Sequence, residues 1–402
     1  MGAFLLMKTI KILVTGGGTG GHVSPALAVI QTLQEMAAGA DWTPEFRYVG
    51  SRHGIEQGLV KAAGIPFVGV QSGKLRRASS LRGLLTLKNV ADAFRVPVGI
   101  GQAVGEVRRF RPDVVLATGG YVSVPTVIAA GLLRRPVLIH EQTVQIGLAN
   151  QIAARFATRI ALTFDLAASE LPPSLRCKAF VTGNPVRSAI FGGDKARAIL
   201  RLGFDPADNG LPTVYATGGA LGAQSINRAV EAALPDLLAG CRLIHQCGKQ
   251  DGDRMAEVWA GLLPEQQRRY HVVPFVGAEI ADIFALADLV VGRSGAGTVT
   301  EVSALGKPAL FIPLVPTGGD EQTRNARRSV EAGAAALLPS QDLDGPRLLS
   351  EIRALLSDPI RLRAMGAAAL TLATPKAAQD LASVLLEMAA LPPALAPGVG
   401  CP

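Results

Sequence analysis

The stretch "IKILVTGGGTGGHVSPALAVIQTL", residues 10–33, combines three local patterns that together decide the fold. Its first residues are mostly apolar without alternation, as in a strand that is buried on both faces of a parallel sheet. Five glycines between Gly16 and Gly21 then allow a tight turn, and apolar residues recur at helical spacing after it. A strand, a glycine loop and a helix in this order predict the first unit of a doubly wound α/β sheet.

The same order of strand, glycine loop and helix occurs three more times along the chain. It is found in "PDVVLATGGYVSVPTVIAAGLL" (112–133), "PTVYATGGALGAQSINRAVEAAL" (212–234) and "ADLVVGRSGAGTVTEVSALG" (287–306). Short β-branched segments such as "FRYVGS" (46–51) and "PALFIPL" (308–314) lie in the intervals. Strands that alternate with helices in this way predict an α/β protein with two doubly wound, Rossmann-like domains, each with a parallel sheet.

The length of 402 residues also favours two domains. The join is expected near "VTGNPVRSAIF" (181–191), where a strand ends in a glycine and a proline. We therefore predict a first domain over residues 1–186 and a second over 187–373. The helical segment within residues 374–402 is expected to pack back on the first domain.

The positive charge of the chain belongs to its first half. The formal net charge is +8, with 20 Lys and Arg against 10 Asp and Glu up to Val186, and 20 against 22 after it. Nucleic acid, an anionic membrane surface or an acidic substrate could each explain this asymmetry. No apolar run approaches the length of a membrane-spanning helix. The first 18 residues are untypical of a signal peptide, because no charge precedes their apolar stretch and lysines interrupt it.

One segment concentrates the basic residues. In "GKLRRASSLRGLLTLKNVADAFRV" (73–96), six lysines and arginines accompany one acid, and apolar residues recur at helical spacing. This pattern fits a peripheral patch on an anionic membrane surface, where each basic residue adds roughly 1 kcal/mol. It also fits a helix that docks on its own domain and exposes a basic rim to solvent.

The glycine loops are typical of anion binding, because a helix N-terminus exposes free N–H groups. A dinucleotide fold would carry an acid at the end of the second strand to bind the ribose, but this strand ends in Val49-Gly50-Ser51. In the second half, "GGALGAQ" (218–224) and "GRSGAGTVTE" (292–301) both follow expected strands, and two such helix N-termini would suit a diphosphate. Glu301, on the first turns of its helix, could face a ribose diol.

The motifs together resemble one enzyme family. "GGGTGGHVSPALAV", "TGGYVSVP", "HEQ", "GNPVR", "GGALGAQSIN", "HQCGK", "RSGAGTVTE" and "DEQTRNA" occur in the order and spacing of the MurG family. These are the N-acetylglucosaminyltransferases of peptidoglycan synthesis. The resemblance covers roughly residues 8–390. It implies a GT-B fold, in which the two Rossmann-like domains face each other across a cleft, with the acceptor on the first and the nucleotide sugar on the second.

The family's reaction is an inverting transfer of N-acetylglucosamine (GlcNAc) from UDP-GlcNAc to the muramic acid 4-hydroxyl of undecaprenyl-linked lipid I, which gives lipid II. The resemblance implies no cofactor, no nucleic acid, and a peripheral location on the cytoplasmic face of the inner membrane. UDP-GlcNAc, lipid I and the anionic membrane surface are the expected partners, and proteins of the cell-wall and division complexes are further candidates.

The resemblance also implies roles for individual residues. Glu301 would bind the ribose, the Ala296–Thr300 turn the diphosphate, Val276 the uracil through its backbone, and Gln322 the sugar hydroxyls. The full donor set expected is Thr19, Gly20, Gly21, Thr143, Arg187, Ala220, Val276, Ala296, Gly297, Thr298, Val299, Thr300, Glu301 and Gln322. The acceptor set expected is Gly17, Gly18, Gly119, Gly120 and His140.

The chain departs from the family pattern at three positions, two of which belong to this set. Ala220 and Leu221 stand where the family commonly has Ser-Gln, so a hydroxyl that could contact a phosphate is missing and the phosphate must rely on backbone N–H groups. Thr143 stands where the family often has Asn. Asp251-Gly252-Asp253 has the D-x-D pattern of metal-dependent nucleotide-sugar enzymes, but its polar surroundings favour a solvated turn, and we expect no metal site.

His22 is the expected general base. An inverting transfer needs a group that takes the proton of the attacking hydroxyl, and an imidazole can do so near neutral pH. His22 lies where the first glycine loop meets its helix, and the glycines allow both sugars to approach the backbone closely. A histidine that only caps the helix or positions a substrate remains the alternative, and Glu141 in "HEQ" is then the next candidate base.

Two other functions remain compatible with the motifs. The chain could be another GT-B enzyme that uses a UDP-sugar, such as a glycolipid glycosyltransferase or a UDP-GlcNAc 2-epimerase. It could also be a nucleotide-sugar sensor without catalytic activity. The release of UDP from UDP-GlcNAc with and without a lipid I analogue is the experiment that best distinguishes these functions.

Overall fold

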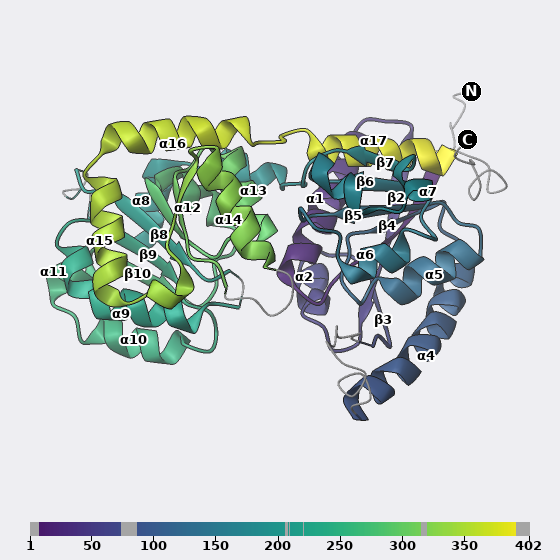
Figure 1. Ribbon diagram of the computed structural model, residues 1–402, viewed down its shortest axis with the longest axis horizontal. Coiled ribbons are helices and arrows are strands. Elements are labelled where there is room, and N and C mark those ends of the chain that lie inside the picture. Colours follow the sequence, from purple (N-terminus) through teal and green to yellow (C-terminus); the bar gives the residue numbers. More distant parts are fainter. Residues whose placement is uncertain are drawn as a thin grey trace, which may run out of the picture. The chain divides into compact units, whose positions relative to one another are not determined.

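The computed structural model describes residues 8–73, 87–205, 208, 210–219, 221–314 and 320–390. These residues form two compact units (Figure 1). Unit 1 comprises the described residues up to Arg187 and those from Thr374 on, and unit 2 spans Ser188–Ala373.

Unit 1 contains a seven-stranded parallel sheet in the order β3-β2-β1-β4-β5-β6-β7. Its strands are β1 (Lys8–Thr15), β2 (Trp42–Ser51), β3 (Phe67–Val70), β4 (Val114–Ala117), β5 (Val137–Glu141), β6 (Arg159–Leu162) and β7 (Ala179–Val181). Its helices are α1 (Gly20–Ala37), α2 (Glu56–Ala62), α4 (Leu87–Phe110), α5 (Val124–Leu132), α6 (Leu148–Ala153), η1 (Asp165–Glu170), α7 (Pro173–Arg176) and α17 (Ala377–Ala390).

The last helix of the chain completes the core of unit 1. Leu381, Leu385 and Met388 of α17 are buried in one cluster with Ile12 of β1 and Val29 of α1. Figure 1 shows α17 in yellow, and it packs along α1. The apolar face of α17 therefore packs in the core of a sheet whose strands lie some 200 or more residues earlier in the chain.

Unit 2 contains a six-stranded parallel sheet in the order β10-β9-β8-β11-β12-β13. Its strands are β8 (Thr213–Thr217), β9 (Arg242–Gln246), β10 (Tyr270–Val273), β11 (Leu289–Gly292), β12 (Ala309–Phe311) and β13 (Ala335–Leu337). Its helices are η2 (Ser188–Gly192), α8 (Lys195–Leu202), α9 (Gln224–Leu238), α10 (Gly252–Ala260), α11 (Pro264–Gln267), α12 (Ile280–Leu286), α13 (Ala296–Ala304), α14 (Glu321–Glu331), η4 (Ser340–Asp342), α15 (Gly345–Leu356) and α16 (Pro359–Thr371).

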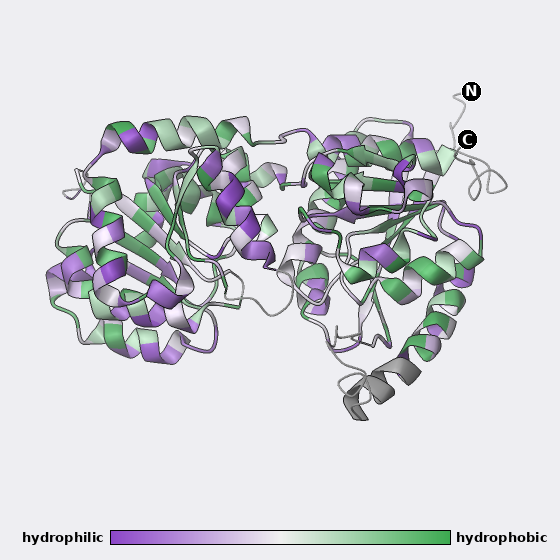
Figure 2. Cartoon of the chain, viewed as in Figure 1, coloured by the Kyte–Doolittle hydropathy of each residue, from purple (hydrophilic) through white to green (hydrophobic). Residues whose placement is uncertain are grey.

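The central strands of both sheets are buried on both faces. Every residue of β4, β5, β8, β9 and β11 is buried, and the hydropathy colouring shows apolar strands beneath helices of mixed polarity (Figure 2). Parallel sheets covered by helices on both faces require this pattern. The prediction of two doubly wound parallel sheets is confirmed.

Each sheet has one point at which the strand order reverses direction. In unit 1 the chain moves outward from β1 to β3 and then restarts at β4 on the other side of β1; in unit 2 it does the same at β8 and β11. Ligands of doubly wound sheets bind at the carboxyl ends of the strands at such a switch point. None of the helices in the described residues has the length and apolar character needed to cross a membrane.

Candidate functional site

The switch point of unit 1 brings two glycine loops into backbone contact. The loop after β1 begins at Gly16 and the loop after β4 at Thr118, whose N–H donates to the carbonyl of Thr15 over 2.9 Å. The N–H of Gly17 donates to the carbonyl of Gly119 over 3.3 Å. Sequence segments that lie 100 residues apart therefore form one surface at the carboxyl edge of the sheet.

His22 lies on this surface, in the first turn of α1, and it is half-buried. Its Nδ1 is 3.1 Å from the carbonyl oxygen of Thr118 and 2.8 Å from the Oε1 of Gln142. A carbonyl oxygen only accepts hydrogen bonds, so Nδ1 carries the hydrogen. In the neutral ring, the other nitrogen, Nε2, then has a free lone pair that can accept a proton.

The glycines at 119 and 120 are required by the position of the His22 ring. Gly119 and Gly120 have φ values of +93° and +79°, which favour glycine. A Cβ on Gly120 would overlap the carbonyl oxygen of Gly17 and lie 3.0 Å from the His22 ring, and one on Gly119 would lie 3.3 Å from Nδ1. Of the residues predicted for the acceptor, Gly17, Gly119 and Gly120 thus lie together, with His22 among them.

A buried carboxylate that the sequence analysis missed supports the first glycine loop. Glu56 is fully buried. Its Oε2 accepts from the N–H of Gly18 over 3.2 Å and its Oε1 from the N–H of Ser51 over 2.7 Å. A Cβ on Gly17 would lie only 2.6 Å from its Cδ. An anionic phosphate in this loop would meet a negative charge, which argues against a dinucleotide in unit 1.

Glu141 and Thr143 are turned into the interior of unit 1. The Glu141 carboxylate is buried. Its Oε1 accepts a hydrogen bond from the N–H of Thr143 and lies 2.8 Å from the Oγ1 of the same residue. Its Oε2 accepts from the N–H of Gly147 and the Nδ2 of Asn150, both over 2.9 Å. Four contacts occupy both oxygens, so this carboxylate orders the turn that follows β5.

His140 is also enclosed by the protein. The side chain is fully buried, with its Nε2 2.9 Å from the carbonyl oxygen of Gly183 and its Nδ1 3.2 Å from the Nε2 of Gln142. Burial is the main cause that lowers the pKa of His140 to about 4. The hydrogen bond to Gly183 raises this pKa in part, and the neighbouring His22 lowers it further. His140 is therefore neutral near pH 7, and in this arrangement it has no exposed atom for an acceptor to contact.

The other predicted donor residues of unit 1 are more accessible than the buried Thr143. Thr19 and Gly21, at the N-terminus of α1, are exposed, Gly20 is half-buried, and Arg187 is exposed at the end of the unit. Thr19 occupies the N-cap position, but its side chain makes no capping hydrogen bond.

The switch point of unit 2 presents two helix N-termini. Helix α9 follows β8 and α13 follows β11, and these two strands are neighbours. The residues predicted for the diphosphate, Ala296–Thr300, form the first turns of α13 and are half-buried, as is Glu301. Ala220 lies outside the described residues, and the neighbouring Leu221 is exposed.

Arg293 places a positive charge between these helices, and the sequence analysis missed it as a separate feature. Its Nη2 donates to the Oγ of Ser225 in α9 over 2.8 Å, and its Nη1 donates to the carbonyls of Ile312 and Pro313 and to Ser340. Among the described residues it forms no ion pair with a carboxylate. Burial lowers its pKa, but an arginine keeps its charge in proteins.

Gln322 and Val276 also follow carboxyl ends of strands in unit 2. The Oε1 of Gln322 accepts from the N–H of Leu314 over 2.9 Å, and its carbonyl accepts from the Oγ of Ser294 over 2.7 Å. Gln322 is therefore linked to the loop before α13. Val276 is buried in the loop after β10.

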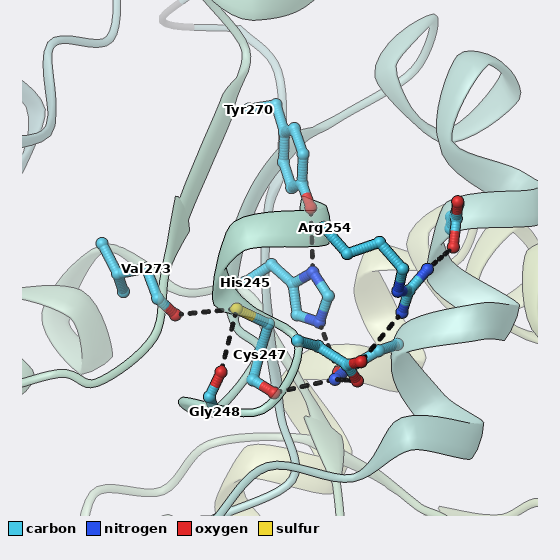
Figure 3. A network of polar contacts seen from close by, with 9 residues as sticks. His245, Cys247, Gly248, Arg254, Tyr270 and Val273 are labelled. Carbon is cyan, nitrogen blue, oxygen red and sulfur yellow. Dashed lines mark hydrogen bonds and ion pairs between the residues drawn. The ribbon is translucent and has the colours of Figure 1, made fainter. Parts of the chain in front are cut away.

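A buried polar network fixes the loop that precedes α9 (Figure 3). His245 lies between the Tyr270 hydroxyl and the Oδ1 of Asn227, both at 2.9 Å, and burial lowers its pKa to about 3. The Nδ2 of Asn227 donates to the carbonyl of Cys247 and to Asp251. A Cβ on Gly222 would overlap that Cys247 carbonyl, so the network and the glycine loop pack closely.

The expectation of a solvated turn at Asp251 is wrong. Asp251 is buried, its Oδ2 accepts from Asn227 over 2.6 Å, and it forms an ion pair with Arg254. These contacts give the D-x-D segment a structural role in unit 2. In the part of the chain that the structure describes, no three His, Cys, Asp or Glu side chains gather as a metal ion would require.

Comparisons with known proteins follow the same division into two units. Residues 12–162 match the model of the glycosyltransferase family 28 N-terminal domain, and residues 213–381 match that of the glycosyltransferase family 28 C-terminal domain. A Bacillus cereus protein named UDP-N-acetylglucosamine--N-acetylmuramyl-(pentapeptide) pyrophosphoryl-undecaprenol N-acetylglucosamine transferase 2 is 38% identical over 347 residues, which cover 86% of this chain and 91% of the relative. A transferase of the same name, without the numeral, from Desulforudis audaxviator is 36% identical over 94% of this chain and 99% of its own.

Solved structures agree with these relatives. The crystal structure of Acinetobacter baumannii MurG is 27% identical, with a TM-score of 0.67 over 94% of this chain and 99% of that one. A crystal structure of a UDP-N-acetylglucosamine 2-epimerase reaches a TM-score of 0.65 at 16% identity, a likeness that concerns the fold alone.

The burial of His140 predicts that unit 1 loses stability in mild acid. The pKa of His140 in the folded chain lies below its ordinary value of 6.5, so between about pH 6.5 and 4 the unfolded chain binds more protons. The free energy of unfolding then falls as the pH falls, with a limiting slope of about 1.4 kcal/mol per pH unit. Urea unfolding between about pH 7.5 and 5, followed by the fluorescence of Trp42 in a Trp259→Phe background, measures this slope for unit 1.

His140→Gln should flatten the dependence, and His53→Gln, which removes an exposed imidazole from the same unit, should keep the slope of the parent. Equal slopes in all three proteins would contradict the assignment to His140.

Proposed function

The chain belongs to glycosyltransferase family 28, and we propose that it transfers GlcNAc from UDP-GlcNAc to the muramic acid 4-hydroxyl of lipid I with inversion, forming lipid II. The curated relatives carry the name of this transferase at 36–39% identity over most of their length. The resemblance to the MurG family seen in the motifs is thereby confirmed, and the protein is a glycosyltransferase of peptidoglycan synthesis with the two Rossmann-like units of the GT-B class.

One observation supports the division of labour between the units: their equivalent glycine loops differ in charge. The loop of unit 1 rests on the buried carboxylate of Glu56 and adjoins His22. The loops of unit 2 adjoin the guanidinium of Arg293 and the N-termini of α9 and α13. A diphosphate is stabilised beside the second set and repelled by the first. We therefore assign the nucleotide to unit 2 and the attacking hydroxyl to unit 1.

In the donor site of unit 2, Glu301 binds the ribose hydroxyls, Val276 offers its backbone to the uracil, and Gln322 contacts the sugar. The first turn of α13 holds the diphosphate through its free N–H groups. Ala220 and Leu221 have no side-chain hydroxyl that could bind a phosphate. Arg293 and the Ser225 hydroxyl that it contacts are therefore proposed as further phosphate contacts. The remaining donor contacts proposed are those of unit 1, namely Thr19, Gly20, Gly21 and Arg187.

The transfer then needs one proton acceptor and one stabilised leaving group. His22 Nε2 takes the proton of the 4-hydroxyl as that oxygen attacks the anomeric carbon of GlcNAc. The bond between this carbon and the diphosphate oxygen breaks on the opposite face, which inverts the configuration. The negative charge that develops on the leaving UDP is met by Arg293 and the helix N-termini, which are positioned before the reaction.

Glu141 is the less suitable base in this arrangement. Both of its oxygens already accept hydrogen bonds from Thr143, Gly147 and Asn150. A carboxylate held in this way would have to break those contacts in order to bind a proton. We assign to Glu141 and Thr143 the ordering of the turn, and to the glycines 17, 18, 119 and 120 the close approach of the acceptor.

The proposal is tested by the release of UDP from UDP-GlcNAc with and without a soluble lipid I analogue. The transferase releases UDP only when the analogue is present and converts it to the disaccharide product. A 2-epimerase would turn over UDP-GlcNAc without an acceptor, and a sensor would bind UDP-GlcNAc and release no UDP with any acceptor. Either of these results would overturn the proposed reaction.

In the same assay, His22→Ala should lower kcat by roughly 10²–10⁴, the range typical of a lost general base, and leave the donor KM nearly unchanged. His22→Gln should restore little activity, because an amide can orient the hydroxyl but cannot take its proton. Substantial turnover by the glutamine variant would show that His22 positions the acceptor and would return Glu141 as the candidate base.

Glu301→Gln should raise the donor KM more than it lowers kcat. The ribose is remote from the reacting carbon, so its contacts stabilise the ground state and the transition state alike. Loss of a charge-assisted hydrogen bond costs on the order of 1.5–3 kcal/mol, about a 10- to 150-fold rise in KM. Glu257→Gln, an exposed position on α10 of the same unit, serves as the matched control. An unchanged KM with a collapsed kcat would contradict the ribose contact.

We further propose that unit 1 binds the anionic surface of the membrane that carries lipid I, at the cytoplasmic face. Most of the basic segment 73–96 lies outside the described residues, and of its six basic side chains only that of Arg95 is described, as exposed. Helix α4, which continues this segment, packs on α5. Val98 of α4 is 49% exposed and Leu132 of α5 is 63% exposed, and Arg134 beside it is exposed. Exposed apolar and basic side chains together suit a lipid headgroup region.

Replacing Arg76, Arg77 and Arg82 by Ser should weaken pelleting with vesicles that contain anionic lipids, and added salt should weaken the binding of the parent. The alternative, a basic rim that only faces solvent, predicts no change.

The control removes the same charge from exposed positions of unit 2, with Arg268, Arg361 and Arg363 replaced by Ser. Its pelleting should match that of the parent. Equal losses in the two triple variants would indicate an effect of net charge and would exclude a patch on unit 1.

A further inference from the structure

Building on the proposed role of His22 as the base, we propose that Gln142 and His140 are positioning residues that hold His22 in the tautomer whose Nε2 is unprotonated. The three side chains form a chain of hydrogen bonds that runs from the half-buried His22 into the interior and ends on the carbonyl of Gly183. Neither Gln142 nor His140 needs to touch a substrate for this role.

The donor and acceptor roles along these hydrogen bonds are set at their inner end, at Gly183. The carbonyl oxygen of Gly183 can only accept, and the Nε2 of His140 lies 2.9 Å from it. Because burial keeps His140 neutral near pH 7, its ring carries one hydrogen, and that hydrogen is on Nε2. The Nδ1 of His140 therefore has only a lone pair and needs a donor.

Gln142 is the donor, and this fixes the orientation of its amide. Its nitrogen lies 3.2 Å from the Nδ1 of His140 and 2.5 Å from the carbonyl oxygen of Thr118, and both of these atoms accept. The amide oxygen must then point the other way, where it lies 2.8 Å from the Nδ1 of His22. Gln142 is only 2% exposed, so water does not compete freely for these contacts.

The consequence for His22 is a single tautomer. The amide oxygen accepts the Nδ1 hydrogen of His22, and the more distant Thr118 carbonyl, already engaged by the Gln142 amide, adds a second acceptor at 3.1 Å. In water a neutral histidine ring favours the other tautomer, with the hydrogen on Nε2, and that form could not accept a proton at Nε2. Gln142 thus selects the form that the proposed base requires.

These hydrogen bonds also explain why an amide, that of Gln142, lies between His22 and His140. An amide offers a donor to His140 and an acceptor to His22, whereas a carboxylate offers two acceptors. Gln142→Glu would leave the Nδ1 of His140 facing an acceptor, and its charge would stabilise a protonated His22. The acid limb of the kcat profile should then move to higher pH.

The test compares Gln142→Leu with the parent in the full chain labelled with ¹⁵N-histidine. In the parent, the ¹⁵N shifts of His22 should show a protonated Nδ1 and an unprotonated Nε2 near pH 7.5 to 8. In Gln142→Leu the share of this tautomer should fall, and kcat should drop roughly 10- to 100-fold, as is typical for partners that orient a reacting group. The donor KM should stay within about two-fold.

Gln151→Leu is the control, because the Gln151 amide donates to the carbonyl of Ile146 and has no hydrogen bond to a histidine among the described residues. It should keep the parental tautomer and kcat. If Gln142→Leu does not fold, Gln142→Glu keeps the size of the side chain and gives the pH profile as the readout.

Two results would overturn the inference: an Nε2-protonated His22 in the parent, or a parental tautomer and kcat in Gln142→Leu together with an unmoved acid limb in Gln142→Glu. A result in which His22 is not the general base can be told apart from these two results. In that case the parent shows the expected tautomer and Gln142→Leu loses it, but His22→Gln keeps its turnover.

Discussion

The loops after β1 and β4 touch backbone to backbone, and the arrangement of unit 1 depends on that contact. The N–H of Gly17 reaches the carbonyl of Gly119, and the Gly17 carbonyl lies where a side chain at Gly120 would be. With side chains at these positions the two loops would separate, and the ring of His22 would lose both the glycine surface on which it packs and the Thr118 carbonyl that binds its Nδ1. Because β1 and β4 end side by side at the switch point, their loops can hold the ring of His22 in one orientation.

The two units use the same βα element in opposite electrostatic settings. Below the first loop of unit 1, Glu56 satisfies the N–H of Gly18 from within the protein. In unit 2 the corresponding edge holds Arg293, whose charge has no carboxylate partner among the described residues, beside two helix N-termini. The same glycine-loop element thus lies beside a carboxylate in one unit and beside a guanidinium in the other, and these charges disfavour an anion at the first and favour one at the second.

The sequence predicted the two doubly wound sheets and the glycine loops at their carboxyl edges, because both follow from local patterns. Apolar strands without alternation indicate parallel sheets, and glycine loops after them indicate the carboxyl edge. Side-chain contacts could not be predicted in the same way. In "HEQT", His140, Glu141 and Gln142 are three consecutive polar residues, and their roles differ because their partners, Gly183, Asn150 and His22, come from three different segments.

Glu56 and Asp251 illustrate the same limit. Glu56 follows the second strand by five residues, too late for the dinucleotide pattern, and only the fold brings it under Gly18. Asp251 is polar in a polar stretch, and nothing local shows that Asn227 will bury it. Both are charged residues buried by tertiary partners, which composition and spacing cannot reveal.

In each unit a buried, neutral histidine helps to hold the loops at the carboxyl edge of the sheet. Loops at this edge lack the ladder hydrogen bonds of the strands, so their order must come from side chains. In unit 1 His140 links Gly183 to Gln142, and in unit 2 His245 links Tyr270 to Asn227, which holds the turn packed against the glycine loop. A neutral imidazole suits this role, because it is one of the few side chains that can donate at one end and accept at the other. Burial favours the neutral form in both cases. The interior of each unit thus sets the direction of the hydrogen bonds that reach its surface, and in unit 1 that direction ends at the ring of His22.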